Sequence, residues 1–126
     1  SMFGQLRQDE RGVDLKRGGI FPIVHGLRCL ALKHGISQRN SFARCEALEQ
    51  VGGMDAALAR DVAQTLAVLQ RLRLDAQLAT LDAGGVPDNF LQPAALRRLD
   101  RELLRDALRV VKAFQQHVRS VFHLND

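Results

Sequence analysis

The sequence predicts an all-α protein, an antiparallel bundle of four to five helices preceded by an irregular N-terminal arm. Three observations carry this prediction. Leucines recur at three- and four-residue steps, β-branched residues are sparse outside 20–24, and no long stretch alternates apolar with polar residues. A chain of 126 residues, 46% hydrophobic and 25% charged, is expected to form one domain over 1–126 around a single core.

The predicted arm covers 1–19, is polar, shows no helical stripe and ends in a Gly-Gly turn. The bundle is expected over 20–123. Its first helix is predicted over about 20–34, with Pro22 in the first turn and Gly35 as the stop. A second helix begins with Asn40 or Ser41 as its N-cap and ends at Gly52-Gly53.

Asp55 is expected to cap a long third helix that ends at Gly84-Gly85, followed by a loop over 84–93 and a fourth helix from Pro93 to about His123. The predicted buried faces of these two helices are rows of apolar side chains. They are Leu58, Val62, Leu66, Leu69, Leu74, Leu78 and Leu81 in the third helix, and Leu96, Leu99, Leu103, Ala107, Val110, Val111, Phe114, Val118 and Val121 in the fourth.

The formal net charge is +4, and fifteen of the eighteen cations are arginine. Because arginine pairs bidentately with phosphates and carboxylates, this bias favours an anionic partner or many internal ion pairs. Cys29 and Cys45 have no metal spacing to other cysteines or histidines, and both are expected to be reduced and packed in the core. No apolar run approaches the roughly 20 residues that span a bilayer, so a cytoplasmic location and no membrane partner are expected.

The most informative segment places Lys16, Arg17, Gly18 and Gly19 directly before a predicted helix. Free N–H groups and the positive end of the helix dipole favour an anion there, and glycine lets a phosphate approach the backbone. One turn into that helix, His25 and Arg28 share a polar edge. The alternative interpretation is a glycine turn with solvated cations.

Arg73 and Gln77 stand four residues apart on the third helix and are predicted to join an interhelical polar network with Asp106 or Asp88. Asn89, Arg105 and Arg109 are further candidates for this network. Asp88-Asn89 also has the character of a turn and capping pair. A basic stripe on the fourth helix could follow a phosphate backbone, but acids interrupt it and no Trp or Tyr offers a stacking platform, so nucleic-acid binding is the less favoured function. The stripe comprises Arg98, Arg101, Arg105, Arg109 and Lys112.

Several separated motifs together resemble the bacterial family of nucleotidyltransferase substrate-binding domains. They are Asp14-Leu15-Lys16-Arg17-Gly18-Gly19-Ile20-Phe21-Pro22-Ile23-Val24-His25-Gly26-Leu27-Arg28, Leu72-Arg73-Leu74 with Gln77, Pro87-Asp88-Asn89, and Arg105-Asp106-Ala107-Leu108-Arg109. The resemblance implies a helical domain that closes over a nucleotidyltransferase domain located N-terminal to it in a signal-transduction protein. The Lys-Arg-Gly-Gly-Ile core is also similar to a segment of the protein-PII uridylyltransferase bundles.

This resemblance implies that Lys16 and Arg17 neutralise a triphosphate, that Gly18 and Gly19 donate backbone N–H groups, and that Asp14 holds a cation or a sugar hydroxyl. His25 and Arg28 would be neighbours in the cleft. The chain has no Gly-Ser pair of the catalytic domain, so it is expected to hold no catalytic residue, metal or cofactor of its own. Mg²⁺ and a nucleoside triphosphate are expected with the catalytic domain.

The sequence leaves open whether the parent protein is an active enzyme and which nucleotide or acceptor protein it uses. The competing function is a non-catalytic interaction or dimerisation module, and a homo-oligomer is compatible with both functions.

Overall fold

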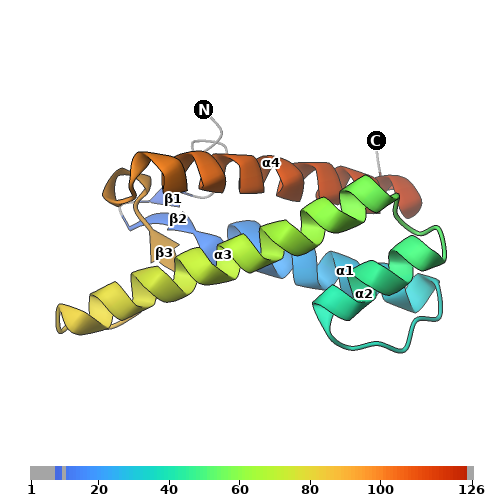
Figure 1. Cartoon of the computed structure of the whole chain (residues 1–126), viewed down its shortest axis with the longest axis horizontal. Coiled ribbons are helices and arrows are strands. Elements are labelled where there is room, and N and C mark those ends of the chain that lie inside the picture. The colour runs from blue at the N-terminus through green and yellow to red at the C-terminus, as the bar shows by residue number, and fades with distance from the viewer. Residues whose placement is uncertain (1–7, 10, 125–126) are drawn as a thin grey trace.

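The computed structural model of the chain describes residues 8–9 and 11–124. In this part of the chain four α-helices form the body of the protein, and a small sheet covers one end (Figure 1). The helices are α1 (Phe21–Lys33), α2 (Ser41–Gln50), α3 (Ala56–Asp82) and α4 (Arg98–Val121). The strands are β1 (Gln8–Asp9), β2 (Gly12–Asp14) and β3 (Phe90–Leu91). The predicted all-α bundle is confirmed.

The predicted boundaries at Gly35, Asn40 and Asp55 are confirmed, because these residues act as expected, whereas the fourth helix begins at Arg98 and not at Pro93. The Asn40 side chain accepts hydrogen bonds from the N–H groups of Phe42 and Ala43, and Asp55 accepts one from Leu58. Gly35 follows α1 with a φ of +66°, a left-handed conformation that glycine adopts at little cost. Local sequence therefore sets where the first three helices stop and start.

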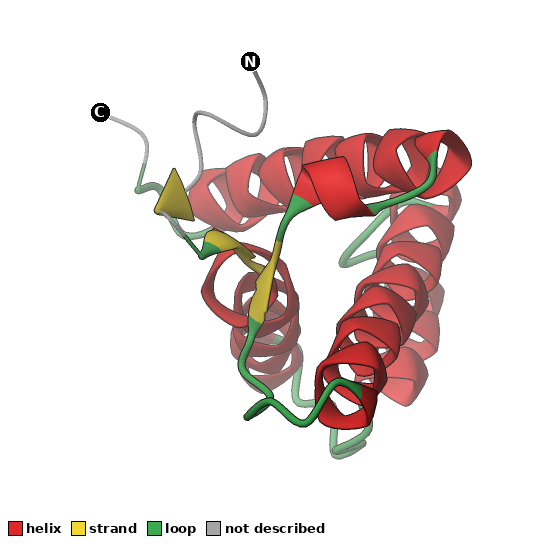
Figure 2. Ribbon diagram, turned by 90° about the vertical axis from the view of Figure 1, so that its left-hand side faces the viewer, coloured by secondary structure: helices red, strands yellow, loops and turns green. Residues whose placement is uncertain are grey.

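The core lies between α1, α3 and α4, which enclose it when the bundle is viewed from its end (Figure 2). Phe114 on α4 is fully buried, and its ring packs against Gly26 of α1. A Cβ atom at Gly26 would lie only 2.5 Å from the Phe114 ring, so the missing side chain lets the two helices approach closely. Other fully buried members of the core are Leu15, Ile23, Leu27, Leu30, Leu48, Leu66, Leu69, Leu72 and Leu104.

The prediction of an irregular arm is wrong for its described part, whereas residues 1–7 and 10 lie outside the described residues. β1 and β2 pair antiparallel, and β2 also pairs antiparallel with β3, where Val13 faces Leu91 and Asp14 faces Phe90. β3 falls inside the predicted 84–93 loop. Strands of two or three residues are too short to show an apolar–polar alternation, so the sequence pattern does not reveal them.

Two predicted helical faces need correction. On α4, Leu99 and Leu103 are exposed, whereas Leu104 and Leu108 are buried. The predicted phase started from Leu96, which instead follows a 3₁₀ turn at Pro93–Ala95 before α4 begins. The error is confined to the first part of the helix, since Ala107, Val111 and Phe114 are buried as predicted.

On α3 the error concerns the second half of the helix. Leu74, Leu78 and Leu81 are each about half exposed, because this half projects beyond the other helices (Figure 1). Helical periodicity indicates which side chains share a face, but it does not tell where the neighbouring elements end.

No helix within the described residues combines the length and the apolar composition needed to span a bilayer.

Candidate functional site

The Lys-Arg-Gly-Gly segment lies inside a helical turn rather than before one. Lys16–Ile20 forms a π-helical turn that continues directly into α1, and the Phe21 N–H donates to the Lys16 carbonyl. The predicted Gly-Gly turn ahead of the helix is therefore wrong. Pro22 explains why this turn is wide. In a regular α-helical turn the Pro22 ring would clash with the Gly18 carbonyl.

Asp14 caps this wide turn. Its carboxylate accepts a hydrogen bond from the Arg17 backbone N–H at 2.9 Å, so one donor at the start of the turn is already satisfied within the chain. A carboxylate also complements the positive end of the helical backbone. Asp14 thus has a structural function in the described chain, and this function competes with the predicted contact to a cation or a sugar.

The two glycines differ in their surroundings. Gly19 is buried, and a Cβ atom there would lie 2.8 Å from Cδ1 of Leu69 on α3, whereas Gly18 is partly exposed. The absence of a side chain at Gly19 thus allows the turn to pack on α3. Lys16 and Arg17 carry exposed side chains. A ligand at this turn would meet the two cations and Gly18, with Gly19 behind them.

The predicted network around Arg73 and Gln77 exists and holds the segment before β3. Arg73 Nε donates to the Asn89 side-chain oxygen at 2.8 Å, and Gln77 Nε2 donates to the Asp88 carbonyl at 3.1 Å. The Asp88 carboxylate in turn accepts from the Phe90 N–H. The partners are Asp88 and Asn89, and Asp106 takes no part in these bonds.

A single backbone hydrogen bond brings the two motif segments together. The Leu15 N–H donates to the Asn89 carbonyl at 2.9 Å, directly beside the β2–β3 pairing. As a result Asp14, Lys16 and Arg17, which are exposed or partly exposed, adjoin a loop located more than seventy residues further along the chain. We refer to these side chains together with those of Arg73, Gln77, Asp88 and Asn89 as the polar patch.

A hollow of about 500 Å³ adjoins the polar patch and shares Asp88 with it. Phe90 also lines this hollow, and the Arg11 guanidinium carbon lies 3.9 Å from the centre of its ring. The hollow has the size range of small-molecule sites, with apolar walls and a few polar groups. Its other lining residues are Leu72, Asp75, Ala76, Ala79, Thr80, Leu91, Gln92, Ala95, Leu96 and Asp100.

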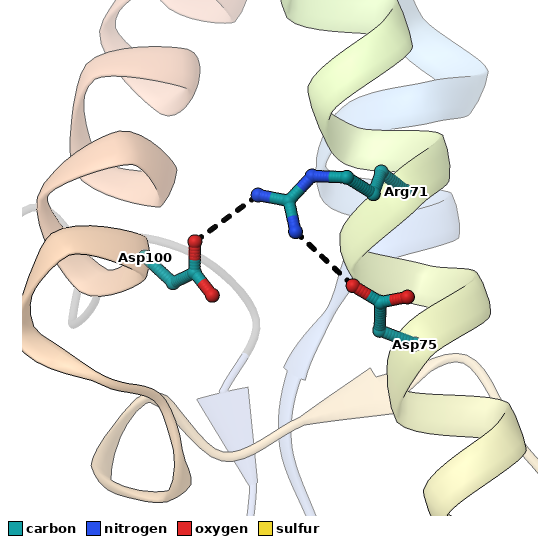
Figure 3. A network of polar contacts seen from close by, with 3 residues as sticks. All are labelled: Arg71, Asp75 and Asp100. Carbon is teal, nitrogen blue, oxygen red and sulfur yellow. Dashed lines mark hydrogen bonds and ion pairs between the residues drawn. The ribbon is translucent and has the colours of Figure 1, made fainter.

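An ion-pair cluster that the predicted network did not include lies at the same end of the bundle. Arg71 on α3 contacts Asp75 at 3.1 Å and Asp100 on α4 at 3.0 Å (Figure 3). The hydrogen bond to Asp100 is the main cause of the raised pKa of Arg71, and the nearby carboxylates add to it. The four-residue spacing of Arg71 and Asp75 on a helix could have predicted their ion pair from the sequence. The bond to Asp100 could not be predicted in this way, because it depends on how α3 packs on α4.

His25 and Arg28 are exposed on α1. His25 stacks on Phe21 with ring centres 5.3 Å apart, and its Nε2 lies 3.8 Å from the Cys29 sulfur. His25 lines a separate groove between α1 and the end of α4, of about 770 Å³, which neither Lys16 nor Arg17 lines. The structure therefore does not bring His25 into a common cleft with the two cations.

The motif on α4 stands apart from the polar patch. Arg109 pairs with Asp106 at 3.0 Å and Arg105 pairs with Glu102 at 3.7 Å, all within the same helix. These pairs interrupt the predicted basic stripe and reduce its attraction for a phosphate backbone. Arg105, Asp106 and Arg109 were expected in the interhelical network, and their described pairing partners are instead local.

No metal site is found among the described residues, where no three His, Cys, Asp or Glu side chains gather as ligands. Asp100-Arg101-Glu102 does have the one-residue spacing of paired metal carboxylates. However, Asp100 pairs with Arg71 and Glu102 with Arg105, so both carboxylates have cationic partners.

The two cysteines are both free but differ in accessibility, and this difference can be tested. Cys45 is buried, and burial raises its pKa from 9.0 to about 11, whereas Cys29 is partly exposed beside the α1–α4 groove. The expectation that both pack in the core is right for Cys45 only. Because the reactive form is the thiolate, a disulfide reagent at pH 8 should modify Cys29 quickly and leave Cys45 unmodified in the folded chain.

The measurement is thiol release with and without denaturant, with Cys29→Ser as the control that removes the fast reaction. Fast modification of Cys45 in the folded chain would contradict the expected burial.

The raised pKa of Cys45 also makes the stability of the fold depend on pH. The neutral buried thiol favours folding fully below pH 9, and this contribution is lost as the pH rises toward 11.

The comparisons with known proteins were consistent with the motifs. A family model described as "Putative nucleotidyltransferase substrate binding domain" matches residues 1–122 of the chain. Searches of the curated proteins and of the solved structures gave no match.

Proposed function

The chain belongs to the family of nucleotidyltransferase substrate-binding domains, and from this premise we propose that it is the nucleotide-binding helical part of a bacterial signal-transduction protein. In this proposal it closes over an N-terminal nucleotidyltransferase domain of the same parent protein, in the cytoplasm. The catalytic domain would resemble that of protein-PII uridylyltransferase and would hold Mg²⁺. The acceptor would be a separate protein.

One observation carries the proposal. The Leu15–Asn89 hydrogen bond joins the Lys16-Arg17 segment to the Asp88-Asn89 loop, and the hollow beside Asp88 opens at the same end of the bundle. The two exposed cations do not line this hollow, but they belong to the polar patch, which shares Asp88 with it, and the hollow has the right size for a small molecule. This arrangement supports a site in which the phosphates of a nucleotide meet Lys16 and Arg17 while another part of it enters the hollow.

The residues of this chain would bind and orient the substrate without reacting themselves. Lys16 and Arg17 would neutralise phosphate oxygens, since ammonium and guanidinium groups donate strong hydrogen bonds to them. The bonds from Arg73 and Gln77 hold the 88–89 loop in place, so the hollow has a fixed wall before a ligand arrives. Mg²⁺ held by the catalytic domain would supply the electrostatic stabilisation of the nucleotidyl group during its transfer.

The test is a titration of Mg-UTP and Mg-ATP into the chain, alone and joined to the nucleotidyltransferase domain of its parent protein. Lys16→Ala and Arg17→Ala should each weaken binding about tenfold, because each removes a charge-assisted hydrogen bond worth roughly 1.5 kcal/mol. Lys112→Ala is the matched control, since it removes an exposed cation from α4, which contributes no residue to the polar patch.

Unchanged affinity in both variants, or no measurable binding by the wild-type protein, would contradict the proposed nucleotide site. The same result would favour the competing function, an interaction module that binds no nucleotide.

A further inference from the structure

Two apolar surfaces of the described chain have no partner within it. The first is the groove between α1 and the end of α4, of about 770 Å³. Its walls are mostly apolar, and several of the side chains stand well out into solvent. Leu32 is 73% exposed, Leu124 63% and Phe21 55%. Apolar area of this kind on a small protein typically marks a binding surface.

The second surface is a ridge on the projecting half of α3. Leu74, Leu78 and Leu81 have the spacing i, i+4, i+7, so they form one row along the helix. Each is about half exposed, and the C-terminal end of α3 extends past β3 and the start of α4 (Figure 1). A projecting helix with an exposed leucine row has the shape that fits an apolar groove.

The charges of the two surfaces are complementary. The charged side chains that line the groove are cationic, Lys33 and Arg119. Asp82 ends α3 next to Leu81, and the last turn of α3 contains no basic residue. The helix dipole adds partial negative charge at the same place, so the tip of the ridge is negative.

We propose that the α3 ridge of one copy binds in the α1–α4 groove of a second copy, so that the chain associates head to tail. Contact of ridge with ridge would bring together two surfaces that each carry negative charge at the tip, and contact of groove with groove would bring together Lys33 and Arg119 of both copies. Contact between unlike surfaces pairs opposite charges instead. This inference does not depend on nucleotide binding.

Head-to-tail contact leaves one free ridge and one free groove on every assembly that does not close into a ring. One helix tip in one groove also covers less area than most stable interfaces, so the association should be weak and should depend on concentration. Sedimentation equilibrium between about 10 µM and about 1 mM covers this range of affinity.

Mixing two variants provides the decisive experiment. Leu78→Asp disables the ridge and Leu32→Asp disables the groove, and both positions are exposed, so neither change should disturb the core. We expect the average mass of the wild-type chain to rise with concentration, whereas each variant alone stays monomeric. An equimolar mixture should form a one-to-one dimer, because the intact ridge of one variant meets the intact groove of the other.

Leu99→Asp is the matched control. Leu99 is 76% exposed on α4 and belongs to neither surface, so this variant should associate as the wild type does. A wild-type chain that stays monomeric up to the highest concentration would overturn the inference. So would self-association of either single variant at the wild-type level, or a mixture that remains monomeric. Self-association of a single variant would indicate a symmetric contact, and a monomeric mixture would indicate no contact between ridge and groove.

Discussion

Replacing Phe114 with alanine is expected to lower the free energy of unfolding by about 3–5 kcal/mol, which is the usual cost of removing a buried phenylalanine ring. Phe114 is fully buried between α1, α3 and α4, where it belongs to the main core. Its ring occupies the space that Gly26 leaves open on α1. Because Gly26 has no side chain that could move into the gap, the cavity should collapse only in part.

Urea unfolding followed by circular dichroism measures this loss. Phe21→Ala is the control, because it removes the same ring from a position that is 55% exposed, and it should cost less than about 1 kcal/mol. Equal losses in the two variants would show that Phe114 is not the centre of the core.

Replacing Gly12 with alanine is expected to destabilise the chain by about 2–4 kcal/mol, from backbone strain and a steric clash together. Gly12 has a φ of +109°, where residues with a side chain are strained. A Cβ atom there would lie 2.4 Å from the Leu91 carbonyl oxygen, which belongs to the backbone of β3 and cannot rotate away. The variant should therefore separate β2 from β3 as well as strain its own turn.

Gly84→Ala is the control for this prediction. Gly84 also has a positive φ, +81°, but a Cβ atom there would meet nothing within 4 Å. Backbone strain alone should lower the free energy of unfolding of Gly84→Ala by about 1 kcal/mol. Hydrogen exchange supplies a second measurement, because the Leu15 N–H that bonds to Asn89 should lose protection in Gly12→Ala and keep it in Gly84→Ala. Equal effects of both variants would contradict the steric argument.

The helices could be predicted because their signals are local. Asn40 and Asp55 cap the helices that follow them, and Gly35 has the left-handed conformation of a helix stop. These residues act on backbone groups two or three positions away, so their effect hardly depends on the rest of the fold. The pairing of Arg73 and Gln77 with the loop at 88–89 was predicted in part. Asp88 was one of the two expected partners, whereas Asp106, the other, takes no part in these bonds.

The remaining features depend on contacts between distant segments. The β2–β3 pairing joins residues about eighty positions apart, and the strands are too short to leave a periodic pattern. The π-helical turn depends on Pro22 and on how closely Gly19 packs against Leu69 of α3. For the same reason His25, which shares a motif with Lys16 and Arg17, lines a groove that these two cations do not line.

The wide turn at Lys16–Ile20 also explains a spacing that regular helical geometry would not allow. Leu15, Gly19, Ile23 and Leu27 are all buried, each four residues after the one before. In a regular α-helix three such steps rotate a side chain by about 120° away from its starting direction. The π-helical turn holds roughly one residue more than an α-helical turn, and this extra residue compensates for most of the rotation. Leu15 therefore still points into the core. The turn that contains Gly18 and Gly19 thus restores the direction of the buried side chains. As a result the β1–β2 hairpin and α1, which follow each other without a linker, contribute to the same core.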